Sequence, residues 1–131
     1  MVTSVVNIHK KERCDIYIGR TKDDPMHFGN PYSLGKSAIT SLSRPDRYTC
    51  LLAFHDWITG RADINVEPER RAWIWDNLDL LKGKKLGCFC HPLVCHGDIY
   101  RVLLGEVTLE EILEPIKPKP KAPEPDQVCL F

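Results

Sequence analysis

The chain has no excess of charge of either sign. Its 131 residues include 18 Lys and Arg against 18 Asp and Glu, so the formal net charge at pH 7 is zero. The proline-rich end, from Glu114 onward, holds three bases and three acids, and the body before it is neutral as well. Binding of DNA through bulk charge needs many Lys and Arg contacts that release counterions. The composition therefore excludes nucleic-acid binding that rests on charge alone.

Long apolar runs are also missing. The first 14 residues (MVTSVVNIHKKERC) contain no apolar stretch of signal-peptide length. No segment approaches the ~20 consecutive apolar residues of a membrane span. We therefore expect a cytoplasmic protein with no membrane partner, in which residues 1–113 form one small domain.

The β-rich runs Val2–Ile8 and Cys14–Ile18 predict two strands joined by a polar turn. Residues 20–44 are irregular and interrupted by Pro and Gly, and a loop of this length in a small domain is usually functional. Apolar residues at helical spacing then predict a helix from Pro45 to about Gly60 and a second helix over Pro68–Lys82.

A third strand is predicted over residues 84–90 (KKLGCFC), and its alternation places Cys88 and Cys90 on one face and Phe89 on the other. A tight loop leads from it into a helix over 99–104, and Thr108 begins a capping box for a last short turn. This order of elements predicts a small α/β fold of two or three layers with a short, mostly parallel sheet.

Residues 87–98 (GCFCHPLVCHGD), called here the Cys-His block, are the strongest chemical signal in the body. Together with IGR at 18–20 and FGNP at 28–31, the block resembles an uncharacterised domain family common in phage and bacterial genomes. The family has no settled activity. By analogy alone, the resemblance implies an α/β fold that handles nucleotides.

If the strands that end near Arg20 and Cys90 run parallel, both open into one crevice, where ligands bind in open α/β sheets. The helix that begins near His96 then points its first N–H groups at the crevice. Arg20 offers a guanidinium to a phosphate or carboxylate, unless it forms a structural ion pair, and Asn30 can read a base or sugar edge. We therefore predict a nucleotide or DNA base as ligand, bound by Arg20, Gly29, Asn30, Cys95 and Gly97.

The same crevice has the side chains for catalysis. A base turned out of the DNA helix would lie beside Cys90 and His96, with Asp98 orienting the imidazole. A thiol whose pKa is lowered by the helix end and by His96 would be a nucleophile. We predict Cys90, His96 and Asp98 as catalytic residues. The alternatives are that Asp98 only caps the helix and that the thiols are small buried side chains.

Zinc is a further alternative, because Cys90, His91, Cys95 and His96 have the ligand types of a four-coordinate site. Their spacing argues against it, since the side chains of adjacent residues diverge. The crowding of cysteines is nevertheless typical of a metal or reactive site rather than of a disulfide framework. We predict no cofactor.

The end of the chain combines a proline-rich linker, 114–126, with the apolar pentapeptide QVCLF at 127–131. QVCLF resembles the motif by which many bacterial polymerases and repair factors bind the DNA polymerase sliding clamp. Gln127, Leu130 and Phe131 match its anchor positions, while Cys129 stands where Ser or Asp is usual. The resemblance implies the sliding clamp as partner. Alternatively, the pentapeptide packs on its own domain as an edge strand.

Two functions are consistent with these features. The first is a DNA- or nucleotide-processing enzyme that modifies or excises a base and is recruited to the clamp by Gln127–Phe131. The second is a non-catalytic protein that sequesters a nucleotide or, as a phage protein, blocks the clamp. We favour the first, because a bare inhibitor does not require a polar crevice.

Overall fold

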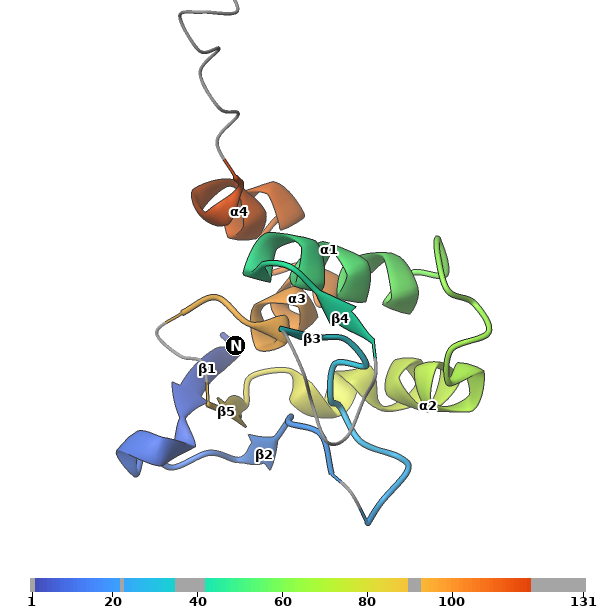
Figure 1. The fold of residues 1–131 in the computed structure, drawn as a ribbon. Helices are drawn as coiled ribbons and strands as arrows, with labels where there is room; N and C mark the ends of the chain where they lie inside the picture. Colours follow the sequence, from blue (N-terminus) through green and yellow to red (C-terminus); the bar gives the residue numbers. More distant parts are fainter. Residues whose placement is uncertain (1, 22, 35–41, 90–92, 119–131) are drawn as a thin grey trace, which may run out of the picture.

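Three short parallel strands form the central sheet, in the order β1-β5-β2 (Figure 1). They are β1 (Ser4–Asn7), β2 (Ile16–Tyr17) and β5 (Lys85–Cys88), and both outer strands pair with β5. The computed structural model describes residues 2–21, 23–34, 42–89 and 93–118. The predicted small α/β fold with a short parallel sheet is confirmed.

The two predicted N-terminal strands are present but shorter than expected, and they are not neighbours. β5 lies between them, and the polar segment after β1 begins with a 3-10 helix, η1 (Ile8–Lys10). Leu86 at the centre of β5 is fully buried, as expected for a strand paired on both sides. The long irregular stretch includes a second parallel pair, β3 (Ser33–Leu34) and β4 (Ser43–Arg44).

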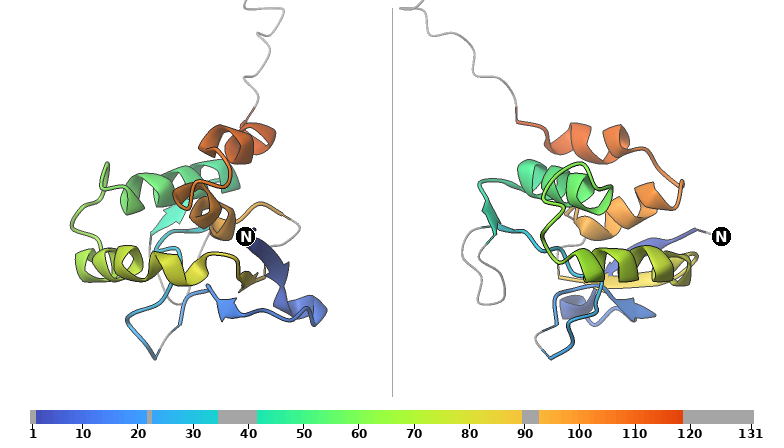
Figure 2. Two further views of the ribbon diagram at one scale, coloured as in Figure 1. Left: turned by 180° about the vertical axis from the view of Figure 1, so that it is seen from behind. Right: turned by 90° about the vertical axis from the view of Figure 1, so that its right-hand side faces the viewer.

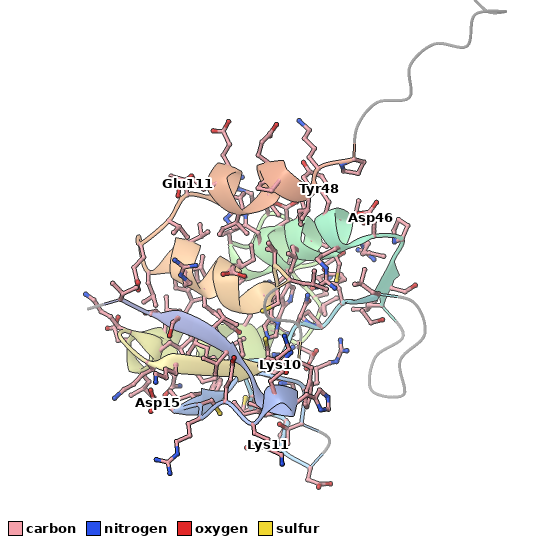
Figure 3. All side chains as sticks on the ribbon, turned by 90° about the vertical axis from the view of Figure 1, so that its left-hand side faces the viewer. Lys10, Lys11, Asp15, Asp46, Tyr48 and Glu111 are labelled. Carbon is pink, nitrogen blue, oxygen red and sulfur yellow. The ribbon has the colours of Figure 1, made fainter. Side chains whose placement is uncertain are left out.

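Helix α1 (Arg47–Ile58) begins where the sequence predicts, because Asp46 caps it. The Asp46 carboxylate accepts a hydrogen bond from the Thr49 N–H at 2.7 Å, and the Asp46 N–H donates to the Thr49 hydroxyl at 3.4 Å. Figure 3 shows Asp46 and Tyr48 together at this end of the helix. Leu51 and Phe54 on the inner face are buried.

The other helices are α2 (Pro68–Asn77), α3 (His96–Leu103) and α4 (Leu109–Leu113). The predicted helix over 68–82 is divided, since α2 gives way to the 3-10 helix η2 (Leu78–Leu81). α3 begins at His96, as expected for the helix that points at the crevice, so it extends three residues further toward the N-terminus than the stretch 99–104. Thr108 caps α4 as predicted, with the Glu111 N–H donating to its hydroxyl at 3.1 Å. Residues 114–116, predicted as linker, form η3 (Glu114–Ile116).

The helices α1, α3 and α4 are stacked on one side of the sheet, as Figures 1 and 2 show from three directions. α3 contacts β1, and α1 and α4 contact α3. Ile99 and Tyr100 of α3, both fully buried, lie in the core beneath α1. Among the helices of the described residues, none is long and apolar enough to cross a membrane. The predicted clamp-binding residues Gln127, Leu130 and Phe131 lie outside the described part of the chain.

Candidate functional site

A cavity of about 430 Å³ lies where β2 and β5 end. Because parallel strands end at the same edge of a sheet, the residues that follow β2 and β5 meet there, as the sequence predicts. Segments 30–34 and α1 supply the facing side. The lining residues are Tyr17, Gly19, Arg20, Asn30, Tyr32, Ser33, Leu34, Arg47, Cys50, Leu51, Cys88, Phe89, Cys95 and His96.

Two guanidinium groups give the cavity its charge. Arg20 and Arg47 both line it, and no described lining residue is an Asp or Glu. Nη1 of Arg20 donates to the carbonyls of Asn30 at 3.1 Å and Tyr32 at 2.8 Å, and Nη1 of Arg47 donates to the Val94 carbonyl at 2.9 Å. Backbone carbonyls therefore hold both groups in place without neutralising them. The arrangement favours an anionic ligand.

An aromatic rim, formed by Tyr17 and Phe89, borders the cavity. The two side chains are 39% and 47% exposed, so both rings are accessible from solvent. Their centroids are 5.9 Å apart in an edge-to-face arrangement, and the His9 ring lies 4.1 Å from that of Phe89. Exposed rings beside a cationic cavity are suited to stacking on a planar group such as a nucleobase.

His96 is neutral in this site. Its Nε2 lies 2.6 Å from the Ile18 carbonyl, which only accepts hydrogen bonds, so Nε2 carries the proton. Burial against Phe54 and Tyr100 lowers the pKa of His96 to about 4, and the charges of Arg20 and Arg70 act in the same direction. Nδ1 consequently has a lone pair that can accept a proton or a hydrogen bond.

Asp98, predicted to orient the imidazole, instead caps α3. Its carboxylate accepts from the Cys95 N–H at 3.1 Å and pairs with Arg101 at 3.1 Å. His96 is oriented by the Ile18 carbonyl, a partner that the sequence pattern did not reveal because it comes from a distant segment. The observed contacts of Asp98 therefore agree with the alternative that it caps the helix.

Gly97, predicted to let a ligand approach, faces the sheet. A Cβ at this position would lie 2.8 Å from Cδ1 of Ile18 and 2.9 Å from Cγ2 of Val5. Real Cβ atoms do not make such contacts, so Gly97 allows α3 to approach the sheet closely. It is absent from the described cavity lining.

Gly29 and Asn30 shape the wall of the cavity. A Cβ on Gly29 would lie 2.7 Å from Cγ of Arg20, so glycine leaves room for the Arg20 side chain. The Asn30 amide oxygen accepts from the Tyr32 N–H at 2.9 Å, and its Nδ2 lies 3.6 Å from Sγ of Cys50. Asn30 lines the cavity, but these contacts use both ends of its amide inside the protein.

Among the described residues, three thiols line the cavity: Cys50, Cys88 and Cys95. Cys95 is the N-cap of α3, and its sulfur accepts from the Gly97 N–H at 3.3 Å. Cys90, predicted as a catalytic residue, and His91, part of the zinc alternative, lie outside the described residues. Within the described part, no group of three or more His, Cys, Asp or Glu side chains could hold a metal ion. Zinc bound with Cys90 and His91 stays an untested alternative.

The aromatic rim, Arg47 and Cys50 line the cavity but were not predicted from the sequence. Two features of the sequence could have indicated these residues. Arg47 and Cys50 lie in the first turns of the helix that follows the long irregular stretch, and Phe89 was assigned to the opposite face of its strand from Cys88. Tyr17 had no distinguishing pattern, because its role depends on the pairing of β2 with β5.

Residues 6–106 match the family model described as "Domain of unknown function (DUF4326)". The match includes every described residue of the cavity lining. Neither the curated proteins nor the solved structures contain a significant match to the chain. The predicted membership of an uncharacterised domain family is thus supported, and the chain belongs to the DUF4326 family.

Proposed function

We propose that the domain binds a nucleotide, or a single base of DNA with its phosphate, in the cavity at the end of β2 and β5, and that it processes this ligand. The main support is the pairing of two anchored guanidiniums, Arg20 and Arg47, with an aromatic rim and no described carboxylate in the lining. A volume of about 430 Å³ is in the usual range for a small-molecule site.

In this proposal the phosphate lies between the guanidiniums. Nη1 of each group is already held by backbone carbonyls. Binding of a phosphate to the remaining N–H donors would therefore cost little further side-chain entropy. The base stacks on the rim of Tyr17 and Phe89. Charge and stacking in one cavity would select a nucleotide over a nucleoside.

The proposed chemistry depends on His96. With its proton on Nε2 and a low pKa, the imidazole offers Nδ1 as an acceptor throughout the neutral pH range. It would take a proton from an attacking water or thiol during modification or excision of the base. Cys90 remains the proposed nucleophile.

A non-catalytic nucleotide binder is the second candidate. Asp98 and Asn30 both use their polar atoms in contacts within the protein, which favours binding without turnover.

As a third part of the proposal, Gln127, Leu130 and Phe131 bring the domain to the bacterial sliding clamp in the cytoplasm. Occupying the clamp without acting on DNA would make the protein a blocker.

Nucleotide binding is tested by calorimetry with deoxynucleoside monophosphates and the matching nucleosides. We expect at least one monophosphate to bind, and its nucleoside to bind ~10-fold or more weakly, because charged hydrogen bonds to phosphate are lost. Arg47→Gln should reduce monophosphate affinity by a similar factor. Arg61→Gln is the matched control, since Arg61 is exposed and absent from the described lining. Equal affinities for both ligand classes would contradict the proposal.

Enzyme and binder are distinguished by His96→Gln. The glutamine amide can keep the donor to the Ile18 carbonyl but has no counterpart of Nδ1. The substrates are single-stranded and duplex oligonucleotides as well as the bound monophosphate, and products are detected by mass spectrometry. An enzyme loses turnover in His96→Gln and Cys90→Ala while it retains ligand affinity. Absence of product with the unsubstituted protein would support the binder.

Recruitment is tested with purified bacterial sliding clamp. We expect the whole chain to be retained on immobilised clamp, and a chain lacking Gln127–Phe131 to be lost from it. Alanine at Leu130 and Phe131 should have the same effect, because these side chains fill the clamp pocket. Equal retention of the whole and shortened chains would end the recruitment proposal and leave the nucleotide proposal intact.

A further inference from the structure

We propose that Cys88 and Cys95, called here the thiol pair, are a reversible oxidation site that forms an intramolecular disulfide in the folded domain. Cys88 is the last residue of β5, and Cys95 is the N-cap of α3. The two sulfurs are 3.4 Å apart, with the Cys95 thiol donating to Sγ of Cys88. A disulfide bond is about 2.05 Å long, so only a small movement of the sulfurs is needed.

Contact between the sulfurs is specific to this pair among the thiols that the structure describes. Cys50 also lines the cavity, but its sulfur lies beside the Asn30 amide at 3.6 Å. Cys14 lies against Gly87 in β5, where a Cβ would be 2.6 Å from its sulfur. Proximity therefore favours coupling of Cys88 to Cys95 over coupling to Cys14 or Cys50.

The cavity gives an oxidant access to both sulfurs. Cys88 and Cys95 are only 3% and 2% exposed, yet both are part of the cavity lining. A molecule as small as hydrogen peroxide can enter a space of about 430 Å³. Bulky reagents that need an exposed thiol would react more slowly, so small oxidants are the appropriate class.

The oxidation is balanced with peroxide as the only co-reactant. One thiol, as its thiolate, attacks a peroxide oxygen, which breaks the O–O bond, forms a sulfenic acid and releases one water. The second sulfur attacks the sulfenic sulfur, forms the S–S bond and releases a second water. Two electrons pass from the two sulfurs to peroxide. A dithiol reductant reverses the process by thiol–disulfide exchange.

Bond formation would change the start of α3. Sγ of Cys95 accepts from the Gly97 N–H at 3.3 Å, and it has to move toward Cys88 to form the bond. This hydrogen bond would lengthen, and the N–H groups at the helix start would be less well satisfied beside His96. The oxidation state of the thiol pair would therefore alter one wall of the cavity.

The experiment uses the full chain with Cys90→Ser, because Cys90 lies between the pair in sequence. Trypsin cleaves after Lys85 and Arg101 and releases residues 86–101 as one peptide, in which Cys88 and Cys95 are then the only cysteines. After treatment with hydrogen peroxide and alkylation, we expect this peptide to be two hydrogens lighter and unalkylated. Dithiothreitol should restore two alkylation sites. Cys90→Ser/Cys95→Ser is the control and should form no disulfide within the peptide.

A disulfide could also form only because the two cysteines are close in sequence. To distinguish this from proximity in the fold, disulfide formation is measured again in glutathione buffers, with and without denaturing urea. We expect the effective concentration of the pair to be at least ~10-fold higher in the folded Cys90→Ser chain than in the unfolded one. Circular dichroism confirms that the variant is folded. Equal or lower values in the folded chain, or persistent alkylation of both thiols under peroxide, would overturn the proposal.

Discussion

A single backbone carbonyl determines how His96 can act. Because the Ile18 carbonyl accepts from Nε2, the proton is fixed on that nitrogen and Nδ1 is the basic atom. Burial keeps the charged form unfavourable and lowers the pKa of the imidazole to about 4. The site thus contains positive guanidiniums and a neutral imidazole, so the attraction for an anionic ligand comes from Arg20 and Arg47 and not from His96.

The low pKa of His96 predicts a pH dependence of stability. The unfolded chain takes up a proton as the pH falls below about 6.5, whereas the folded chain does so only near pH 4. The stabilisation that comes from keeping His96 neutral in the folded state is therefore fully present above pH 6.5. It is lost progressively on acidification toward pH 4. Urea unfolding at pH 7 and pH 4.5 should show the unsubstituted protein losing roughly 2 kcal/mol more than His96→Gln. Similar losses in both would indicate an unshifted imidazole.

Gly97 predicts a packing penalty that a second substitution relieves. Ala at this position would bring its Cβ into Cδ1 of Ile18, at a cost of about 1–3 kcal/mol in unfolding free energy. Ile18→Val removes that methyl group, so it should destabilise the Gly97→Ala protein less than the unsubstituted protein. A double-mutant cycle measured by urea unfolding gives the coupling between the two sites. Additive effects would show that α3 approaches the sheet less closely.

At the scale of elements, the start of α1 positions part of the site, because Arg47 and Cys50 lie in the first turn of the helix that Asp46 caps. Asp46→Ala removes the cap on the Thr49 N–H and should cost about 1 kcal/mol, measured as a lower free energy of thermal or urea unfolding. Asp46→Asn is the matched control and should retain most of the stability, since Asn is as good a cap. If both variants lost the same unfolding free energy, the stabilisation by Asp46 would come from its charge and not from the capping hydrogen bond.

Local signals in the sequence predicted the helices well. Asp46 and Thr108 both mark helix starts through side-chain caps, and these contacts involve residues only three positions apart. The division of the second helix after Asn77 was not predicted, because apolar residues continue at compatible spacing into η2. Strand order was not predictable in the same way, since the position of β5 between β1 and β2 depends on contacts about 70–80 residues apart.

The candidate site was predicted only in part, because it too depends on contacts between segments that are distant in the sequence. Once β2 and β5 run parallel, Arg20, Asn30, Cys95 and His96 gather at one edge, and all four line the cavity. Which of them faces a ligand depends on side-chain partners that come from distant segments. The contacts of Asp98 and Gly97 lie within the fold, and no periodic pattern distinguishes such residues from ligand-binding ones.

At the scale of the whole molecule, the described residues form a packed core without any contribution from the QVCLF pentapeptide, which lies outside the described part of the chain. Among the residues that the structure describes, Leu113 and Ile116 are the last ones packed in or against this core. A chain lacking Gln127–Phe131 should therefore unfold at the same temperature, within about 1 °C, as the whole chain. Calorimetric melting of both checks this. A clear decrease in melting temperature would favour the alternative that the pentapeptide packs on its own domain.

The central position of β5 has a consequence for synthesis on the ribosome. Both β1 and β2 emerge early, but each pairs only with β5 in the sheet, which ends at Cys88. The N-terminal two-thirds of the nascent chain must therefore wait, with its strand edges unsatisfied, until the middle strand leaves the exit tunnel. We therefore expect the sheet, and the cavity at its edge, to form only after Cys88 has been synthesised.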